Sequence, residues 1–206
     1  MPHNSILRNP SAPAILDGVP PMIALDPKTT ALVLIDLQNG ILGRKLEPLS
    51  ADELVEAGKA LAARFRAEGG PVVLVNAAPV AEDKPRAVDE SFALPKILPA
   101  GFIDLAPGLA GPGDILITKA TWGAFSVPEL DRELRKRGVR TIVLGGVATQ
   151  FGVESTARQA WELGYELVIV SDATTSVAIE AHDNSMRHIL PRIARVANSD
   201  ALAFGG

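Results

Sequence analysis

The sequence predicts an α/β domain with three layers, in which helices cover both faces of a mainly parallel sheet of about six strands. Two observations predict it: short apolar runs rich in β-branched residues recur along the chain, and segments with helical periodicity separate them. Strands that are apolar throughout are typical of a parallel sheet buried on both faces. The expected architecture is an αβα sandwich of the Rossmann-like kind.

The predicted strands are residues 30–36, 71–76, 114–119, 140–145, 166–172 and 194–198. The predicted helices are residues 51–68, 126–137, 152–163 and 178–189. The second of these helices has a start signal, because Ser126 and Glu129 have the spacing of a capping box and Pro128 falls in the first turn. Gly138 closes it, as a glycine after a helix often does.

Residues 1–29 are predicted to form a proline-rich arm ahead of one main domain, residues 30–206. Proline breaks both helices and central strands, and the arm has prolines at positions 2, 10, 13, 20, 21 and 27. Its apolar stretch at residues 22–25 suggests that it packs on its own domain or on a partner subunit. A homo-oligomer, at least a dimer, is therefore expected.

Composition excludes several classes of function. The 206-residue chain is 47% hydrophobic and 21% charged, and its formal net charge is −4. It therefore lacks the excess of positive charge that is typical of proteins that bind nucleic acid. Its apolar runs, such as residues 31–35, are far below the ~20 residues of a membrane span. The N-terminus does not resemble a secretory signal, so a cytoplasmic location is expected. The chain has no cysteine, which removes thiol nucleophiles and thiolate metal sites.

Polar residues at the carboxyl ends of the predicted strands mark the candidate site, because ligands of parallel sheets bind there. Asp36 follows five apolar residues, so burial should oppose its ionisation and suit it to carry a proton. The alternative is that Asp36 only caps the following loop. Lys119 also ends a strand, and a lysine there is unusual unless it is paired or used. An ion pair between Asp36 and Lys119 explains both residues.

The segment GGVATQFGVESTARQAWELGY, residues 145–165, reads as a strand that turns tightly into a helix. Backbone N–H groups at such an elbow can hold an anion or a developing oxyanion. Ala148 and Gly152 are the candidates for this role. The alternative for Gly152 is a turn glycine required by backbone angles or packing. The glycines do not form a nucleotide-binding motif.

Other polar and aromatic residues carry weaker signals. His182 and His188 lie on different faces of one predicted helix, so they are expected at its surface or at an interface and are not expected to share a metal. Thr156, like Ser155, has no histidine nearby in the sequence to activate its hydroxyl, so attack by it is a minor hypothesis. Trp122 and Phe125 could form an apolar wall of the site or pack in the core.

Three segments together resemble the isochorismatase-like hydrolases. They are ALVLIDLQNG around Asp36, ITKATWGAF around Lys119, and the elbow segment, and the resemblance spans about residues 30–200. It implies that Asp36 and Lys119 are catalytic residues and that the Val147–Ala148 peptide bond is cis, with the Ala148 N–H in the site. It also implies no cofactor. The zinc ligands of related nicotinamidases have no counterpart, because residues 51–66 contain no histidine, and no metal is expected.

One departure from this family decides the expected chemistry. In its amidase branches the elbow carries a nucleophilic cysteine, and this chain has Gly152 there. True isochorismatases also lack the cysteine and hydrolyse a vinyl ether without a covalent intermediate, with the aspartate as general acid. The resemblance therefore implies that Asp36 donates a proton while Lys119 and Gly152 support it. The residues GVATQ before Phe151 are nevertheless closer to the amidase branches.

The expected substrate is a small anionic metabolite whose C–O or C–N bond is hydrolysed. Asn76, Arg86 and Gln150, with Trp122, are the candidate substrate-binding residues, since an arginine in a loop suits bidentate carboxylate capture. A second interpretation is a family member that has lost its nucleophile and serves as a small-molecule binding or assembly protein. A third is that Gly152 replaces another residue of the natural chain.

Overall fold

A computed structural model of the chain describes residues 22–79, 89 and 98–205. Its main sheet has six parallel strands in the order β4-β3-β2-β5-β6-β7. The strands are β2 (Thr30–Ile35), β3 (Val72–Ala77), β4 (Ile115–Lys119), β5 (Thr141–Val147), β6 (Glu166–Thr175) and β7 (Arg195–Ala197). This sheet confirms the predicted fold class. Arg86 and most of the predicted arm lie outside the described residues.

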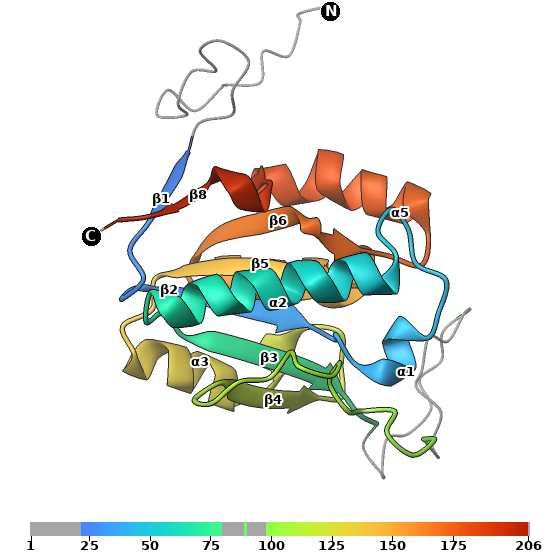
Figure 1. Ribbon diagram of the computed structural model, residues 1–206. Helices are drawn as coiled ribbons and strands as arrows, with labels where there is room; N and C mark the ends of the chain where they lie inside the picture. Colours follow the sequence, from blue (N-terminus) through green and yellow to red (C-terminus); the bar gives the residue numbers. More distant parts are fainter. Residues whose placement is uncertain (1–21, 80–88, 90–97, 206) are drawn as a thin grey trace, which may run out of the picture.

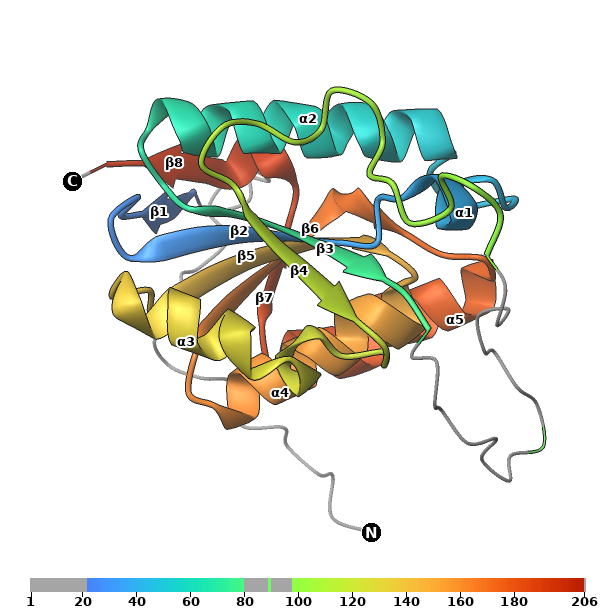
Figure 2. The ribbon, with the colours of Figure 1, turned by 90° about the horizontal axis from the view of Figure 1, so that it is seen from below.

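Helices cover both faces of the sheet, as Figures 1 and 2 show. Helix α2 (Ala51–Ala67) lies on one face, and α3 (Pro128–Lys136), α4 (Glu154–Glu162) and α5 (Ile179–Asn184) lie on the other. The apolar core is accordingly divided in two. The side chain of Leu34 belongs to the cluster beneath α2, and that of its neighbour Val33 belongs to the cluster beneath α3 and α4.

Strand β2 is central because every residue in it is apolar or can be buried. All six of its residues are buried, and it pairs with β3 on one side and β5 on the other. From β2 the chain continues to β3 and β4 on one side, and it then forms β5, β6 and β7 on the other side. The strand order therefore reverses between β2 and β5. Ligands of open α/β sheets bind at the carboxyl ends of the strands around such a point.

Two helix starts differ in how they are capped. Helix α2 begins with a complete capping box, in which the Ser50 hydroxyl accepts from the Glu53 N–H and the Glu53 carboxylate accepts from the Ser50 N–H. The predicted box at Ser126 and Glu129 is wrong. Val127 is the N-cap of α3, and the Ser126 hydroxyl instead donates to the carbonyl of Gly123.

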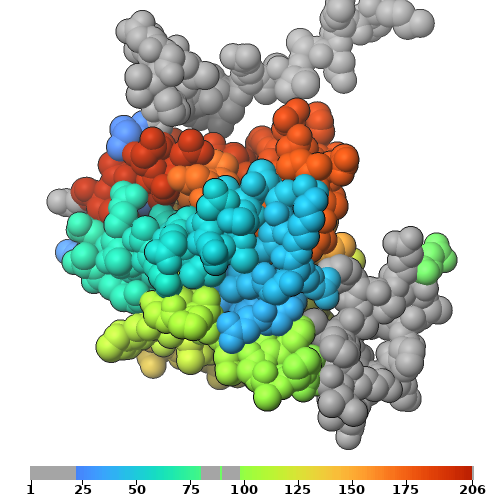
Figure 3. All heavy atoms as spheres, turned by 45° about the vertical axis from the view of Figure 1, so that its right-hand side comes forward, coloured from blue at the N-terminus to red at the C-terminus, as the bar shows by residue number. Residues whose placement is uncertain are grey.

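A second, two-stranded sheet lies beside the end of α2. It pairs β1 (Ile23–Leu25) with β8 (Leu202–Phe204) in parallel, and the Phe204 ring packs edge-on against Phe65 at 4.9 Å between ring centroids. The described end of the predicted arm therefore packs on its own domain. In Figure 3 this C-terminal segment, in red, adjoins the cyan residues of α2.

The remaining elements are short. They are α1 (Asn39–Leu42) and helical turns at Ala124–Ser126, Thr149–Val153, Ser185–Ile189, Leu190–Arg192 and Ser199–Ala201. Within the described ranges, no helix has the length and apolarity that crossing a membrane requires.

Candidate active site

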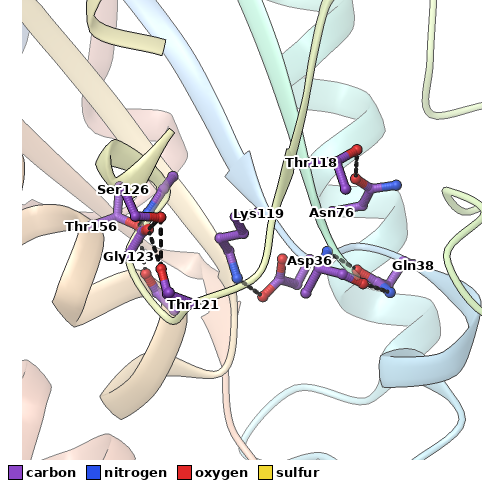
Figure 4. Close-up of polar contacts among 12 residues, drawn as sticks. Asp36, Gln38, Asn76, Thr118, Lys119, Thr121, Gly123, Ser126 and Thr156 are labelled. Atoms are coloured by element: carbon purple, nitrogen blue, oxygen red, sulfur yellow. Dashed lines mark hydrogen bonds and ion pairs between the residues drawn. The ribbon is translucent and has the colours of Figure 1, made fainter. Parts of the chain in front are cut away.

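The ion pair expected from the sequence is present at the carboxyl edge of the sheet. Asp36 directly follows β2, Lys119 is the last residue of β4, and the end of β3 lies between them. The Nζ atom of Lys119 donates to Oδ2 of Asp36 at 2.7 Å, as Figure 4 shows. Both side chains are buried, with exposed fractions of 2% for Lys119 and 10% for Asp36. Such a pair is shielded from solvent and salt.

The backbone of Asp36 is unusual. Its φ of 58° lies in the left-handed region, and no other non-glycine residue of the described chain has a positive φ. Aspartate is among the residues that tolerate this conformation. The Asp36 N–H donates to the carbonyl of Val75 at 2.8 Å, which holds the residue at the sheet edge. Backbone outliers of this kind concentrate at functional sites.

Burial dominates the electrostatics of the Asp36 carboxyl group. Its loss of solvation raises the pKa of Asp36 from 3.8 to about 6, although the charge of Lys119 and the hydrogen bond from it both lower that pKa. The two oxygens differ. Oδ2 accepts from Lys119, whereas Oδ1 is buried and has no hydrogen-bond partner. A buried polar atom without a partner is rare and costly, so it calls for an explanation.

The elbow begins where β5 ends. The Val147–Ala148 peptide bond is cis, which confirms the expectation from the family resemblance. Across the described residues, the Ala148 N–H makes no hydrogen bond to the protein. The chain then forms the turn Thr149–Val153 before α4, so the helix begins at Glu154, two residues later than predicted.

Gly152 lies directly against the acid. A Cβ atom added at this position would lie 3.2 Å from Asp36 Oδ2 and 2.7 Å from the Cγ2 atom of Ile35. Both distances are shorter than ordinary van der Waals contacts between side chains. The elbow therefore approaches Asp36 as closely as it does because residue 152 has no side chain.

Three of the predicted substrate-binding residues lie in the described chain. Asn76 donates to the Ile103 carbonyl at 2.9 Å and accepts from the Thr118 hydroxyl, so its amide is largely engaged. The Gln150 carbonyl oxygen accepts from the Ser176 hydroxyl. Trp122 is half-exposed, and its ring centroid lies 4.7 Å from that of Phe151, the neighbour of Gly152.

The other residues singled out in the sequence are Phe125 and two histidines. The ring of Phe125 lies 5.6 Å from that of Tyr165 and packs against the core, so it is not part of an open wall. His182 was expected at a helix surface or an interface, and the surface position is wrong. It is buried, and its Nδ1 atom lies 2.8 Å from the Thr149 hydroxyl oxygen. Burial lowers the pKa of His182. His188 is exposed. Across the described ranges, no group of three or more histidine or acidic side chains could hold a metal ion.

Sequence reasoning missed two residues that shape the site. The fully buried Gln38 pairs with the backbone of Ala77, donating to its carbonyl at 3.0 Å and accepting from its N–H at 2.6 Å. Thr156, considered only as a nucleophile, instead bonds to the elbow and to the segment after Lys119. A polar residue next to a buried strand was the available signal for Gln38.

Comparisons with known proteins point to one family. The family model described as "Isochorismatase domain" matches residues 30–201. The chain is 48% identical over 185 residues to the uncharacterized isochorismatase family protein YecD of Escherichia coli O157:H7, which covers 88% of this chain and 98% of YecD. It is 32% identical to the ureidoacrylate amidohydrolase RutB of Variovorax paradoxus, over 81% of this chain and 77% of RutB.

A solved structure supports the same assignment. An isochorismatase family protein from Burkholderia thailandensis superposes with a TM-score of 0.82 at 38% sequence identity. The superposition covers 88% of this chain and 96% of that one.

Proposed function

The chain belongs to the isochorismatase family of hydrolases, and from that premise we propose that it hydrolyses a C–O or C–N bond of a small anionic metabolite without a covalent intermediate. Asp36 is the general acid in this proposal. Lys119 orients it, and the backbone at Ala148 and Gly152 holds an anionic group of the substrate. No cofactor is required.

The observation that carries the proposal is the difference between the two oxygens of Asp36. Because Lys119 occupies Oδ2, the proton of the neutral acid resides on Oδ1, which has no partner in the protein. A pKa of about 6 keeps a useful fraction of the group protonated near neutrality. General acids work best when their pKa lies near the working pH. Burial raises the pKa of Asp36 into this range, although the nearby ammonium group of Lys119 lowers it.

For a vinyl ether, the reaction begins with transfer of the Oδ1 proton to the terminal carbon of the double bond. The π electrons form the new C–H bond, which leaves an oxocarbenium ion and an ionised Asp36. Water then adds to the cationic carbon and returns a proton to Asp36. The resulting hemiketal collapses to a carbonyl compound and an alcohol. Since the first step moves a proton from a neutral acid, Lys119 favours the carboxylate that forms.

Two features of the elbow support the binding of an anionic group beside this acid. The unpaired N–H of Ala148 can donate to a carboxylate, and the absence of a side chain at Gly152 lets the elbow backbone pack close to Asp36. Trp122 with Phe151 offers an apolar surface next to the elbow. Gln150 and Asn76 retain amide N–H groups for a carbonyl or carboxylate. Arg86 is kept as a proposed carboxylate ligand on the sequence argument alone.

The bond class is tested with a panel of vinyl ethers, amides and esters that carry a carboxylate. Amides belong in it because the name of the RutB relative denotes an amidohydrolase. We expect one class to be hydrolysed by the natural protein and not by Asp36→Asn, with unchanged folding by circular dichroism. Turnover that survives Asp36→Asn contradicts the acid role.

The lack of cysteine favours a second candidate, a family member that binds small molecules without turning them over. Calorimetric binding of panel compounds that are never hydrolysed supports this candidate over the first. We also propose that the chain forms a homo-oligomer. Light scattering of the full chain and of a form without residues 1–21 tests whether the N-terminal arm contributes.

A further inference from the structure

Two segments far apart in the sequence flank the Asp36–Lys119 pair. One is the loop 120–126, which continues from Lys119, and the other is the elbow that ends at Gly152. We propose that Thr156 is a positioning residue, whose hydroxyl joins this loop to the elbow and thereby sets the distance between the Lys119 ammonium and Asp36. The effect on catalysis rests on the proposed function, whereas the effect on the distance between Lys119 and Asp36 does not.

The hydroxyl group of Thr156 has a fully assigned pair of hydrogen bonds. It donates to the carbonyl of Gly152 at 2.6 Å and accepts from the N–H of Ala124 at 3.0 Å. Thr156 and Ala124 are both 0% exposed, so water cannot substitute for either bond. A hydroxyl with its one proton already donated to a backbone carbonyl is poorly placed to act as a nucleophile. Its role is to connect two backbones.

A second hydrogen bond, one helical turn further along α4, also connects the loop 120–126 to this helix. The side-chain oxygen of Gln159 accepts from the N–H of Phe125 at 3.1 Å. The loop passes so close to Gln159 that a Cβ atom added at Gly123 would lie 2.1 Å from the same oxygen. Two successive loop residues, Ala124 and Phe125, therefore bond to side chains of α4. The absence of a side chain at Gly123 makes the close approach possible.

The loop can transmit this attachment to Lys119 because it is itself cross-linked. The Thr121 hydroxyl donates to the Ser126 hydroxyl at 2.6 Å, and Ser126 donates to the carbonyl of Gly123 at 2.8 Å. Figure 4 shows these residues and Thr156 grouped beside Lys119 and on the side away from Gln38. Gly152, whose carbonyl accepts from Thr156, also lies beside the acid, since a Cβ added there would be 3.2 Å from Asp36 Oδ2.

The decisive test compares two substitutions of nearly the same size. Thr156→Val removes the hydroxyl and keeps the shape, whereas Thr156→Ser keeps the hydroxyl. We would measure the pKa of Asp36 by ¹³C NMR of its carboxyl carbon, assigned by its loss in Asp36→Asn. Because Lys119 lowers this pKa, loosening the loop should raise it in Thr156→Val and leave it unchanged in Thr156→Ser.

A purely structural threonine would lower the denaturation midpoint of Thr156→Val without changing the pKa of Asp36. An unchanged or lowered pKa in that variant therefore overturns the proposal. If Thr156→Val does not fold, Gln159→Met replaces it, because it removes the acceptor for Phe125 at a partly buried site. The same rise in the pKa is expected there, and the same outcomes overturn it.

Turnover gives a second readout once a substrate is known. We expect Thr156→Val to lower kcat by roughly 10- to 100-fold with little change in KM, since small misplacements of reacting groups have effects of this order. Thr156→Ser should restore most of it. The NMR titration needs no substrate, so it decides the positioning role even if Asp36→Asn shows that the proposed function is wrong.

Discussion

Strand β4 has an ion pair at each of its ends, one partly buried and one buried, and the two pairs differ in how their carboxylate oxygens are hydrogen-bonded. At the amino end, Asp114 pairs with Arg66, whose Nε and Nη2 atoms donate to the two carboxylate oxygens at 3.0 and 2.6 Å. At the carboxyl end, Lys119 pairs with Asp36 through one oxygen. Only the first pair satisfies both carboxylate oxygens.

The surroundings of the two pairs extend this contrast. Oδ2 of Asp114 also accepts from the Gly111 N–H, and Arg66 donates further to the carbonyl of Leu109. The hydrogen bonds to Asp114 raise the pKa of Arg66, so its guanidinium group stays charged. Asp36 in contrast has an unpartnered oxygen and a raised pKa. The Arg66–Asp114 pair thus completes its hydrogen bonds, whereas the Lys119–Asp36 pair leaves one carboxylate oxygen without a partner, and we propose that this oxygen serves the substrate.

The largest expected effect comes from Asp36→Asn, which keeps the shape of the side chain and removes its transferable proton. General acid catalysis contributes about 10²- to 10⁴-fold, so turnover should fall by that amount. Steady-state kinetics on the substrate found in the panel measures it. Asp114→Asn is the matched control, because it makes the same change at the other end of β4. Equal losses of turnover in the two variants would remove the distinction between the pairs.

The pH dependence of stability should show the raised pKa of Asp36. A carboxyl group whose pKa is higher in the folded state binds its proton more tightly there. Its stabilising contribution is therefore complete below pH 3.8 and is lost as the pH rises through about 6. The shift corresponds to about 3 kcal/mol. Urea unfolding from pH 4 to 8 should show this decline in the natural protein relative to Asp36→Asn, and parallel curves would contradict it.

Asp114→Asn should in turn reduce stability and leave turnover unchanged. It weakens two hydrogen bonds from a partly buried guanidinium, for which a loss of about 2 kcal/mol in the free energy of unfolding is expected. Chemical denaturation at pH 7 measures this loss. A stability equal to that of the natural protein would mean that the Arg66–Asp114 pair contributes nothing to the fold.

The smallest expected effect is a shift in the titration of Asp36 in Lys119→Met. Methionine fills a similar volume without the charge that lowers the pKa of Asp36. The pKa of Asp36 should therefore rise above about 6, and the alkaline limb of any activity profile, on which the acid loses its proton, should move to higher pH. A fall in that pKa would show that water, rather than the ammonium group, controls the carboxyl group.

Much of this molecule could be predicted from its sequence because the determining signals are local. An apolar strand followed by Asp36, and another that ends in Lys119, is enough to bring the two to one edge of a parallel sheet. The cis bond before Ala148 came from the family resemblance. These predictions depend on strand periodicity and on a motif that spans a few residues.

The errors have two physical causes, a competing local hydrogen bond and contacts distant in the sequence. The Ser126 hydroxyl bonds to a carbonyl three residues away in its own loop rather than capping α3. His182 is buried because its ring meets Thr149, which is 33 positions away. The contact of Thr156 with Ala124 likewise spans 32 positions. No local pattern encodes such pairings, so only the folded structure reveals them.

The acid role proposed for Asp36 requires that this carboxyl group keep its proton up to about pH 6, with one oxygen free. A ¹³C NMR titration of the Asp36 carboxyl carbon in the natural protein measures this property. We expect a midpoint near pH 6. A midpoint at or below the ordinary value of 3.8 would mean that Lys119 holds Asp36 as a permanent carboxylate, and the acid role would be wrong.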